Sequence, residues 1–233
     1  MRINQQFYWT VLGGVSIVFH IWLIFSGLIP NLVSRPLHMA LALPWCLMYG
    51  RHGLSLRLGT LLTGAGIFCC AYIVFNQEIL SDQYGYISSM WQTVVAILLL
   101  TIVLEMARRS IGWPLPCVAL TALCYGLFGQ YLPGEFGHPG LPLNSFLGTM
   151  TIAEGGIWGK LTGVSVNVVA IFVIFGAVLN AGEAGQGFMN LATAAAGHLK
   201  AGVAKVSVLS SALFGSISGS ASANVASTGS FTL

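Results

Sequence analysis

The stretch Val203–Leu233 reads VAKVSVLSSALFGSISGSASANVASTGSFTL: an apolar run, a glycine- and serine-rich break, and a second run that carries further small polar residues. If Val203–Phe214 is helical, its twelve residues rise only about 18 Å, against a hydrocarbon core of about 30 Å. The break at Gly215–Ser220 then falls near the middle of a bilayer. Polar backbone at that depth is tolerated only where protein or a water-filled cavity satisfies it, so the stretch predicts a re-entrant helical hairpin with a binding site.

The composition places the whole chain in a membrane. Of its 233 residues 56% are hydrophobic and only 6% are charged, and the mean hydropathy is +0.84. Too few polar residues remain to cover a soluble domain of this size. The net charge of +3 comes from scattered lysines and arginines with no basic run, which gives no indication of nucleic-acid binding. We therefore predict an all-α polytopic membrane protein that lies in the lipid bilayer.

About six transmembrane helices are expected from the apolar runs and their flanking charges. The expected spans are Phe7–Ile29, Pro36–Gly50, Leu56–Phe75, Met90–Ala107, Trp113–Tyr131 and Leu161–Asn180. With a cytoplasmic N-terminus, seven of the nine lysines and arginines fall inside, leaving Arg35 and Lys160 outside. This asymmetry favours that orientation. It puts the loop Leu132–Pro142 outside and lets the final hairpin enter from the cytoplasmic side.

Two segments outside the spans have distinct compositions. Leu143–Lys160 is too polar and too rich in glycine for a span, so we expect an interfacial arm or a segment docked sideways against other helices. The spacing of Gly155, Gly159 and Gly163 indicates either a ridge for close helix packing or a flexible loop. Gly187–Lys200 is rich in alanine and is expected to form a short helix.

Three kinds of polar or reactive residue inside the spans are interpreted as structural. Glu105 precedes Arg108 and Arg109 by three and four residues, which favours a surface ion pair over a proton relay. His20 lies in mid-span without an acidic neighbour at helical spacing and is expected to bond a facing helix. The cysteines show no metal-ligand spacing and are interpreted as buried small hydrophobic residues; they are Cys46, Cys69, Cys70, Cys117 and Cys124.

The hairpin carries the strongest chemical pattern. Ser220, Asn224 and Thr228 recur every four residues and would line one face of the returning helix. Oxygens of Ser218, Ser220 and Asn224, with backbone carbonyls at the Gly215–Gly219 turn, are hard neutral ligands suited to Na⁺. The amides of the returning half-helix would favour a carboxylate. Gly215 and Gly219 equally fit a motif for close helix packing, so both interpretations stay open.

An enzymatic role is not supported. A serine among glycines in a membrane is typical of an intramembrane serine protease, but Gly-Ser-Ile-Ser-Gly has Ile217 where the serine of G-x-S-x-G would stand. No histidine follows the hairpin to act as a base, and His198 is expected near the cytoplasmic surface. We therefore predict no catalytic residues and no cofactor.

Several stretches resemble the membrane permease of TRAP transporters, in particular the fused small and large subunit that works with TAXI-type binding proteins. The resemblance rests on GLFGQYLPG, TMTIAEGGIWG, VNVVAIFVIFGAVLNAGEAGQGF and AKVSVLSSALFGSISGSASANVASTGSFTL. It covers Trp113–Leu233 closely. It implies a four-span scaffold at residues 1–109 that resembles the small subunit, followed at 110–233 by the start of a DctM-like large subunit.

The same resemblance implies a function: Na⁺-coupled import of organic acids across the bacterial cytoplasmic membrane, with substrate delivered by an extracytoplasmic TAXI-type binding protein. The family's hairpin signature falls on Gly215, Ser218, Gly219, Ser220, Ala223, Asn224, Thr228 and Gly229. Of these, Ser218, Ser220 and Asn224 are the expected Na⁺ ligands. The family's large subunit continues with a second hairpin that would complete the site, so this chain is expected to be its N-terminal part. The alternatives are a non-transporting scaffold or assembly fragment and, less in keeping with the sequence, a channel.

Overall fold

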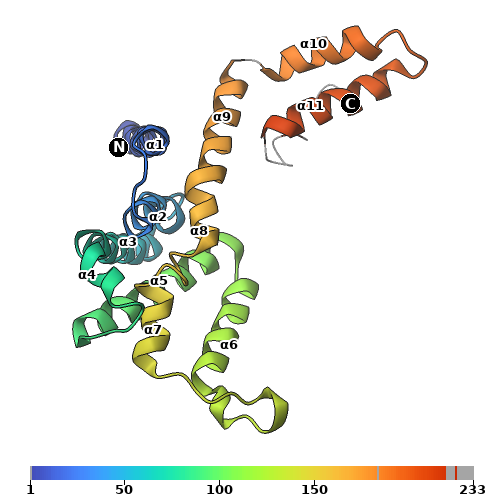
Figure 1. Cartoon of the computed structure of the whole chain (residues 1–233). Helices are drawn as coiled ribbons and strands as arrows, with labels where there is room; N and C mark the ends of the chain where they lie inside the picture. The colour runs from blue at the N-terminus through green and yellow to red at the C-terminus, as the bar shows by residue number, and fades with distance from the viewer. Residues whose placement is uncertain (1, 183, 219–223, 225–233) are drawn as a thin grey trace. The chain divides into compact units, whose positions relative to one another are not determined.

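The computed structural model describes residues 2–182, 184–218 and 224 (Figure 1). Across these residues the chain is helical, with short 3₁₀ turns and one π-helical turn, and contains no β-strand. It divides into two compact units, Met1–Val166 and Asn167–Leu233. The predicted all-α fold with helices able to cross a membrane is confirmed.

Four long helices dominate the first unit: α1 (Arg2–Phe25), α2 (Asn31–Leu47), α3 (Gly53–Phe75) and α5 (Met90–Ile111). Helices α2 and α3 pack closely together and are joined by a tight turn in which Gly50 has a φ of +68°. Helix α5 ends beside this turn, because Arg109 Nη1 donates to the carbonyl oxygens of Leu47 (2.8 Å) and Ser55 (3.3 Å). We call this place the arginine end, because Arg51 lies in the connection between α2 and α3, Arg57 near the start of α3, and Arg108 and Arg109 in the last turn of α5.

The shorter elements of the first unit connect the long helices. They are α4 (Gln77–Asp82), α6 (Pro114–Phe128), the 3₁₀ turns η1 (Gly129–Tyr131) and η2 (Gly134–Phe136), α7 (Leu143–Thr151) and α8 (Lys160–Val164). Helix α6 starts beside the arginine end and returns along α5, with which it packs. The elements η1, η2 and α4 therefore lie at the opposite end of the unit.

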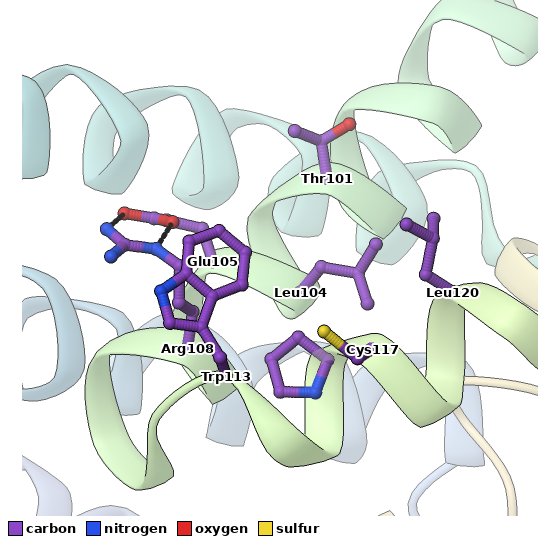
Figure 2. A pocket seen from close by; sticks show the side chains of 8 residues that line it. Thr101, Leu104, Glu105, Arg108, Trp113, Cys117 and Leu120 are labelled. Atoms are coloured by element: carbon purple, nitrogen blue, oxygen red, sulfur yellow. Dashed lines mark hydrogen bonds and ion pairs between the residues drawn. The ribbon is translucent and has the colours of Figure 1, made fainter.

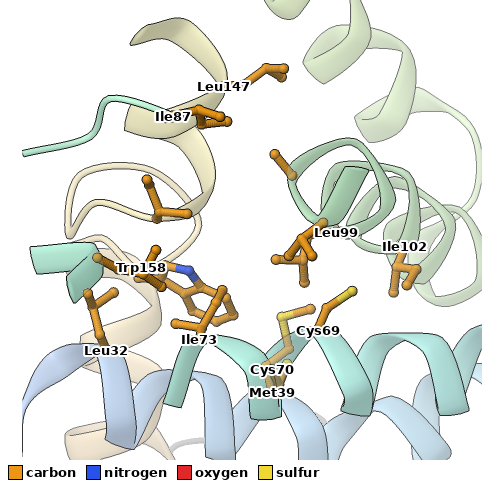
Figure 3. Packing of buried hydrophobic residues seen from close by; sticks show 14 of the residues in the cluster. Leu32, Met39, Cys69, Cys70, Ile73, Ile87, Leu99, Ile102, Leu147 and Trp158 are labelled. Carbon is orange, nitrogen blue, oxygen red and sulfur yellow. The ribbon is translucent and has the colours of Figure 1, made fainter. Parts of the chain in front are cut away.

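The core of the first unit lies among α2, α3, α5 and the segment after α7 (Figure 3). Trp158 is fully buried there, and its Nε1 donates to the Thr151 carbonyl at 2.7 Å. Cys69 and Cys70 are buried as predicted, and Cys46 is half-buried. The prediction was wrong for Cys117 and Cys124, which are exposed because α6 packs mainly against α5 and leaves most of its own surface uncovered.

The lengths of the helices decide which of the six expected spans could cross a membrane. Within the part of the chain that the structure describes, four helical runs are long and apolar enough to cross a membrane: Gln6–Phe25, Gly53–Phe75, Met90–Ile111 and Lys160–Leu179. Helix α2 has 17 residues and α6 has 15, which correspond to about 26 and 23 Å, less than a hydrocarbon core of about 30 Å. Both helices coincide with predicted spans, but each is short for a full crossing.

The segment Leu143–Lys160 docks sideways against other helices, as one of its two interpretations predicted. Helix α7 packs against α5, and Ile152 is fully buried just after it. The glycine ridge is wrong, because Gly155 and Gly159 lie in the loop between α7 and α8 and not on one helix. Gly163, in α8, lies against the guanidinium of Arg35 from α2. A spacing of four makes a ridge only where the backbone is helical throughout.

The second unit consists of α9 (Ala170–Ala181), α10 (Ala184–Ala196) and α11 (Gly202–Ser218). Helix α10 confirms the short helix expected at Gly187–Lys200. It pairs with α11 through a small cluster of Ala192, Ala196 and Val206 and through an edge-to-face contact between Phe188 and Phe214, whose ring centroids are 6.4 Å apart. Because α10 covers one face of α11, residues later in the chain can contact α11 only on its remaining surface.

Candidate functional site

Asn224 lies against α11. The Asn224 Nδ2 group donates to both the carbonyl oxygen and the Oγ of Ser211 at 3.1 Å, and Ser211 Oγ lies 3.4 Å from Asn224 Oδ1. Residue 224 thus lies against a residue thirteen positions earlier in the sequence, on α11. One of the predicted site residues, Asn224, is therefore placed against α11; the turn of the predicted hairpin lies outside the described residues.

Gly215 sits where the returning residue meets α11. A Cβ atom at position 215 would lie 2.9 Å from Asn224 Nδ2, closer than side chains pack. The sequence had predicted that the helix breaks at Gly215, with exposed carbonyls from Gly215 to Gly219. That boundary is wrong, because α11 continues to Ser218. Gly215 therefore allows Asn224 to approach α11 closely, and it does not end the helix.

A cavity of about 570 Å³ adjoins this contact. Its polar lining comes from Ser207, Ser211 and Asn224, and the remainder from Val208, Ala212 and Gly215. Ser207, Ser211 and Gly215 recur every four residues and so share one face of α11. Neither Ser207 nor Ser211 was predicted, because Val203–Phe214 was interpreted as a plain apolar run. Their spacing of four residues was the pattern that could have identified them.

The structure describes only some of the other predicted site residues. Ser218 is the last residue of α11. Gly219, Ser220 and Thr228 lie outside the described residues, as do Ala223 and Gly229 of the family signature. The three-residue Na⁺ set of Ser218, Ser220 and Asn224 therefore remains a prediction, of which Asn224 is the residue now placed against α11.

The first unit contains a second polar cluster, at His20. His20 Nδ1 lies 2.7 Å from the Ser16 carbonyl, which can only accept, so this nitrogen carries the hydrogen. In a neutral ring His20 Nε2 then accepts from His38 Nδ1 at 2.8 Å. His38 Nε2 in turn accepts from Ser165 Oγ at 3.0 Å. The prediction that His20 bonds a facing helix is confirmed, with His38 of α2 as its partner.

The ion pairs predicted at Glu105 are confirmed. Glu105 Oε2 and Oε1 lie 2.6 Å from Arg108 Nε and Arg109 Nε respectively. The side chain of Arg109 is only 5% exposed, whereas that of Arg108 is 36% exposed. Arg51 Nη2 also donates to the Arg109 carbonyl at 3.1 Å. Arg109 thus ties α5 to the α2–α3 turn, while Arg108 stays accessible at the surface.

At the opposite end, the loop after α6 is fixed by its own polar contacts. Tyr125 Oη donates to the Phe136 carbonyl at 3.0 Å, and His138 bonds the Tyr125 carbonyl and the Gly140 amide, each at 3.0 Å. Phe136 and Tyr131 are each 76% exposed. The loop thus holds exposed aromatic side chains on a defined backbone.

A family model described as "Tripartite ATP-independent periplasmic transporter, DctM component" matches residues 98–233, more than half of the chain. The matched region contains every residue of the α11 cavity. No curated protein and no solved structure gave a significant match. The matched family is a component of a transporter and not a class of enzymes.

Proposed function

The chain belongs to the DctM family of tripartite ATP-independent periplasmic transporters, and from that premise we propose that it is the permease part of a Na⁺-coupled importer of organic acids. A DctM component implies a multi-pass membrane protein that works with a substrate-binding protein. Na⁺ coupling, carboxylate substrates, a TAXI-type binding protein and the fusion of small and large subunits are the finer points of the proposal.

The observation that carries the Na⁺ site is the contact of Asn224 with Ser211. It brings neutral oxygens from two parts of the hairpin within 3.4 Å of each other beside a cavity. Two oxygens at that separation can both reach one hard cation, whose oxygen ligands lie at about 2.4 Å. Neutral ligands suit a monovalent ion that must be released after transport.

The membrane potential can make Na⁺ entry favourable enough to drive uptake of the organic acid. Each positive charge that moves inward across 100 mV contributes about 2.3 kcal/mol before any concentration gradient. Two or more Na⁺ ions per carboxylate therefore allow accumulation against a gradient. The amides at the start of the returning half-helix would hold the carboxylate, as the sequence predicted.

The distribution of charge supports the proposed orientation in the cytoplasmic membrane. Arg51, Arg57, Arg108 and Arg109 gather at one end of the first unit, which we assign to the cytoplasm together with the N-terminus. Glu78 and Asp82 lie at the opposite end, in or beside α4. The loop Leu132–Pro142, with its exposed aromatic residues, then faces outward and is the proposed docking place of the binding protein.

The proposal is tested by transport in proteoliposomes that contain the permease with its binding protein. We expect uptake of a radiolabelled carboxylate to require an inward Na⁺ gradient and a negative interior. Omitting the binding protein should abolish it. Uptake that proceeds equally well with K⁺ in place of Na⁺ would contradict the coupling. Absence of uptake under all conditions, with the binding protein still bound, would favour the alternative of a non-transporting scaffold.

A further inference from the structure

A groove of about 260 Å³ lies between α5 and α6 at the arginine end (Figure 2). Its walls are apolar, and Leu104, Cys117 and Leu120 point toward the same space. Thr101 lines the groove seven residues before Arg108, so the groove extends about 10 Å along α5. An open apolar channel of this length, parallel to two membrane helices, suits a hydrocarbon chain.

The mouth of the groove presents a fixed cation. Glu105 holds Arg108 through two bonds, Oε2 to Nε at 2.6 Å and Oε1 to Nη2 at 2.7 Å. The guanidinium carbon lies 5.3 Å from the centroid of the Trp113 ring, within the range of a cation–π contact. Trp113 is 65% exposed, as expected of an indole at a membrane interface, where its N–H can donate to a lipid oxygen.

The charge around the mouth is positive after the internal ion pairs are formed. The four arginines of the arginine end and the single carboxylate Glu105 leave three net positive charges among α2, α3, α5 and α6. The side chain of Arg109 is only 5% exposed and its Nη1 is bonded to backbone carbonyls, whereas the side chain of Arg108 is 36% exposed. Arg108 is therefore the cation that an anionic group at the mouth of the groove would contact. The apolar wall beside it can pack against a hydrocarbon chain but offers nothing to an inorganic ion.

We propose that this groove binds an anionic phospholipid of the leaflet that faces the arginine end. The phosphate lies at Arg108 and Trp113, and one acyl chain lies along Leu104, Cys117 and Leu120. A basic mouth that continues into an apolar groove matches both parts of such a lipid. The site is independent of the Na⁺ hairpin and of transport, so either proposal can fail without the other.

The test counts lipids that stay bound to the purified chain in native mass spectrometry after titration with phosphatidylglycerol or phosphatidylcholine. We expect a preference for phosphatidylglycerol that falls about fivefold in Arg108→Gln. The matched control is Arg57→Gln, which removes an exposed arginine from the same end outside the groove and should change the preference less than twofold.

A second pair of variants tests the apolar wall without changing charge. Cys117→Trp fills the groove and should lower retention of phosphatidylglycerol about as much as Arg108→Gln does. Val118→Trp adds the same bulk to an exposed position of α6 that does not line the groove, and should have little effect. Equal retention by Arg108→Gln, Cys117→Trp and the unaltered chain overturns the proposal. Displacement of the lipid by millimolar inorganic phosphate would also overturn it, because the site would then recognise phosphate alone.

Discussion

Asn224 lies against Gly215 so closely that a Cβ atom on residue 215 would come within 2.9 Å of the Asn224 amide nitrogen. Asn224 is held there by its bonds to Ser211, so it cannot withdraw without losing them. This contact thus explains why the last turn of α11 carries a glycine at position 215.

The first prediction concerns Gly215→Ala. In an exposed helix this change stabilises by about 1 kcal/mol, but here we expect a lower thermal unfolding temperature and weaker Na⁺ dependence, because Asn224 must move. Gly187→Ala in α10 is the control, since a Cβ there meets no neighbouring atom. If both variants unfold at equal or higher temperature than the unaltered protein, the contact does not constrain residue 215.

Replacing His38 by alanine should destabilise the first unit. The change leaves His20 Nε2 and Ser165 Oγ without the ring that bonds them, and a buried polar group left unsatisfied costs about 1–3 kcal/mol. Thermal unfolding in detergent measures the effect. His52→Ala, at an exposed position before α3, is the control. The double variant at His20 and His38 should cost less than the sum of the two single changes.

Helix packing at the arginine end is tested by Gly59→Ala. A Cβ at position 59 would collide with the carbonyl of Leu47 and lie 3.1 Å from Arg109 Nη1. We expect the variant to lower the yield of folded protein in detergent, because α3 would have to move away from α2. Gly64→Ala is the matched control in the same helix, where the added methyl meets nothing within 4 Å. Similar yields for the two variants would show that α2 and α3 tolerate separation.

The orientation proposed for the membrane can be mapped with single cysteines in a background in which Cys117 and Cys124 are serine. Tyr84 is 93% exposed at the end opposite the arginines, and Ser110 is exposed beside them. In intact cells an impermeant maleimide should label Tyr84→Cys but not Ser110→Cys. The reverse pattern would place the arginine end outside and overturn the orientation.

Features that depend on residues close in sequence were predictable. The ion pairs of Glu105 follow from helical spacing alone. The role of His20 was predicted, but its partner His38 was not, because the contact depends on how two helices rotate against each other. The glycine ridge failed for a related reason, since the spacing of Gly155 and Gly159 has no meaning in a loop.

In the candidate site, too, some residues could be predicted from the sequence and others could not. The small polar residues after α11 predicted a site that includes Asn224, and Asn224 lies beside the cavity. Ser211 and Ser207 were not predicted, because serines in an apolar membrane helix are also common at packing positions. Their exposure to the cavity follows from the face of α11 that α10 leaves uncovered, which no local pattern encodes.

The most direct test of the Na⁺ site is the Na⁺ concentration that gives half-maximal uptake in Asn224→Ala and Ser211→Ala. Loss of one oxygen ligand from a cation site should raise that concentration about tenfold or more, a cost of about 1.4 kcal/mol. Ser216→Ala is the control, because Ser216 lies on α11 outside the cavity and bonds the Leu213 carbonyl. The account predicts a large shift for Asn224→Ala and Ser211→Ala and none for the control. An unchanged Na⁺ dependence in both Asn224→Ala and Ser211→Ala would contradict it.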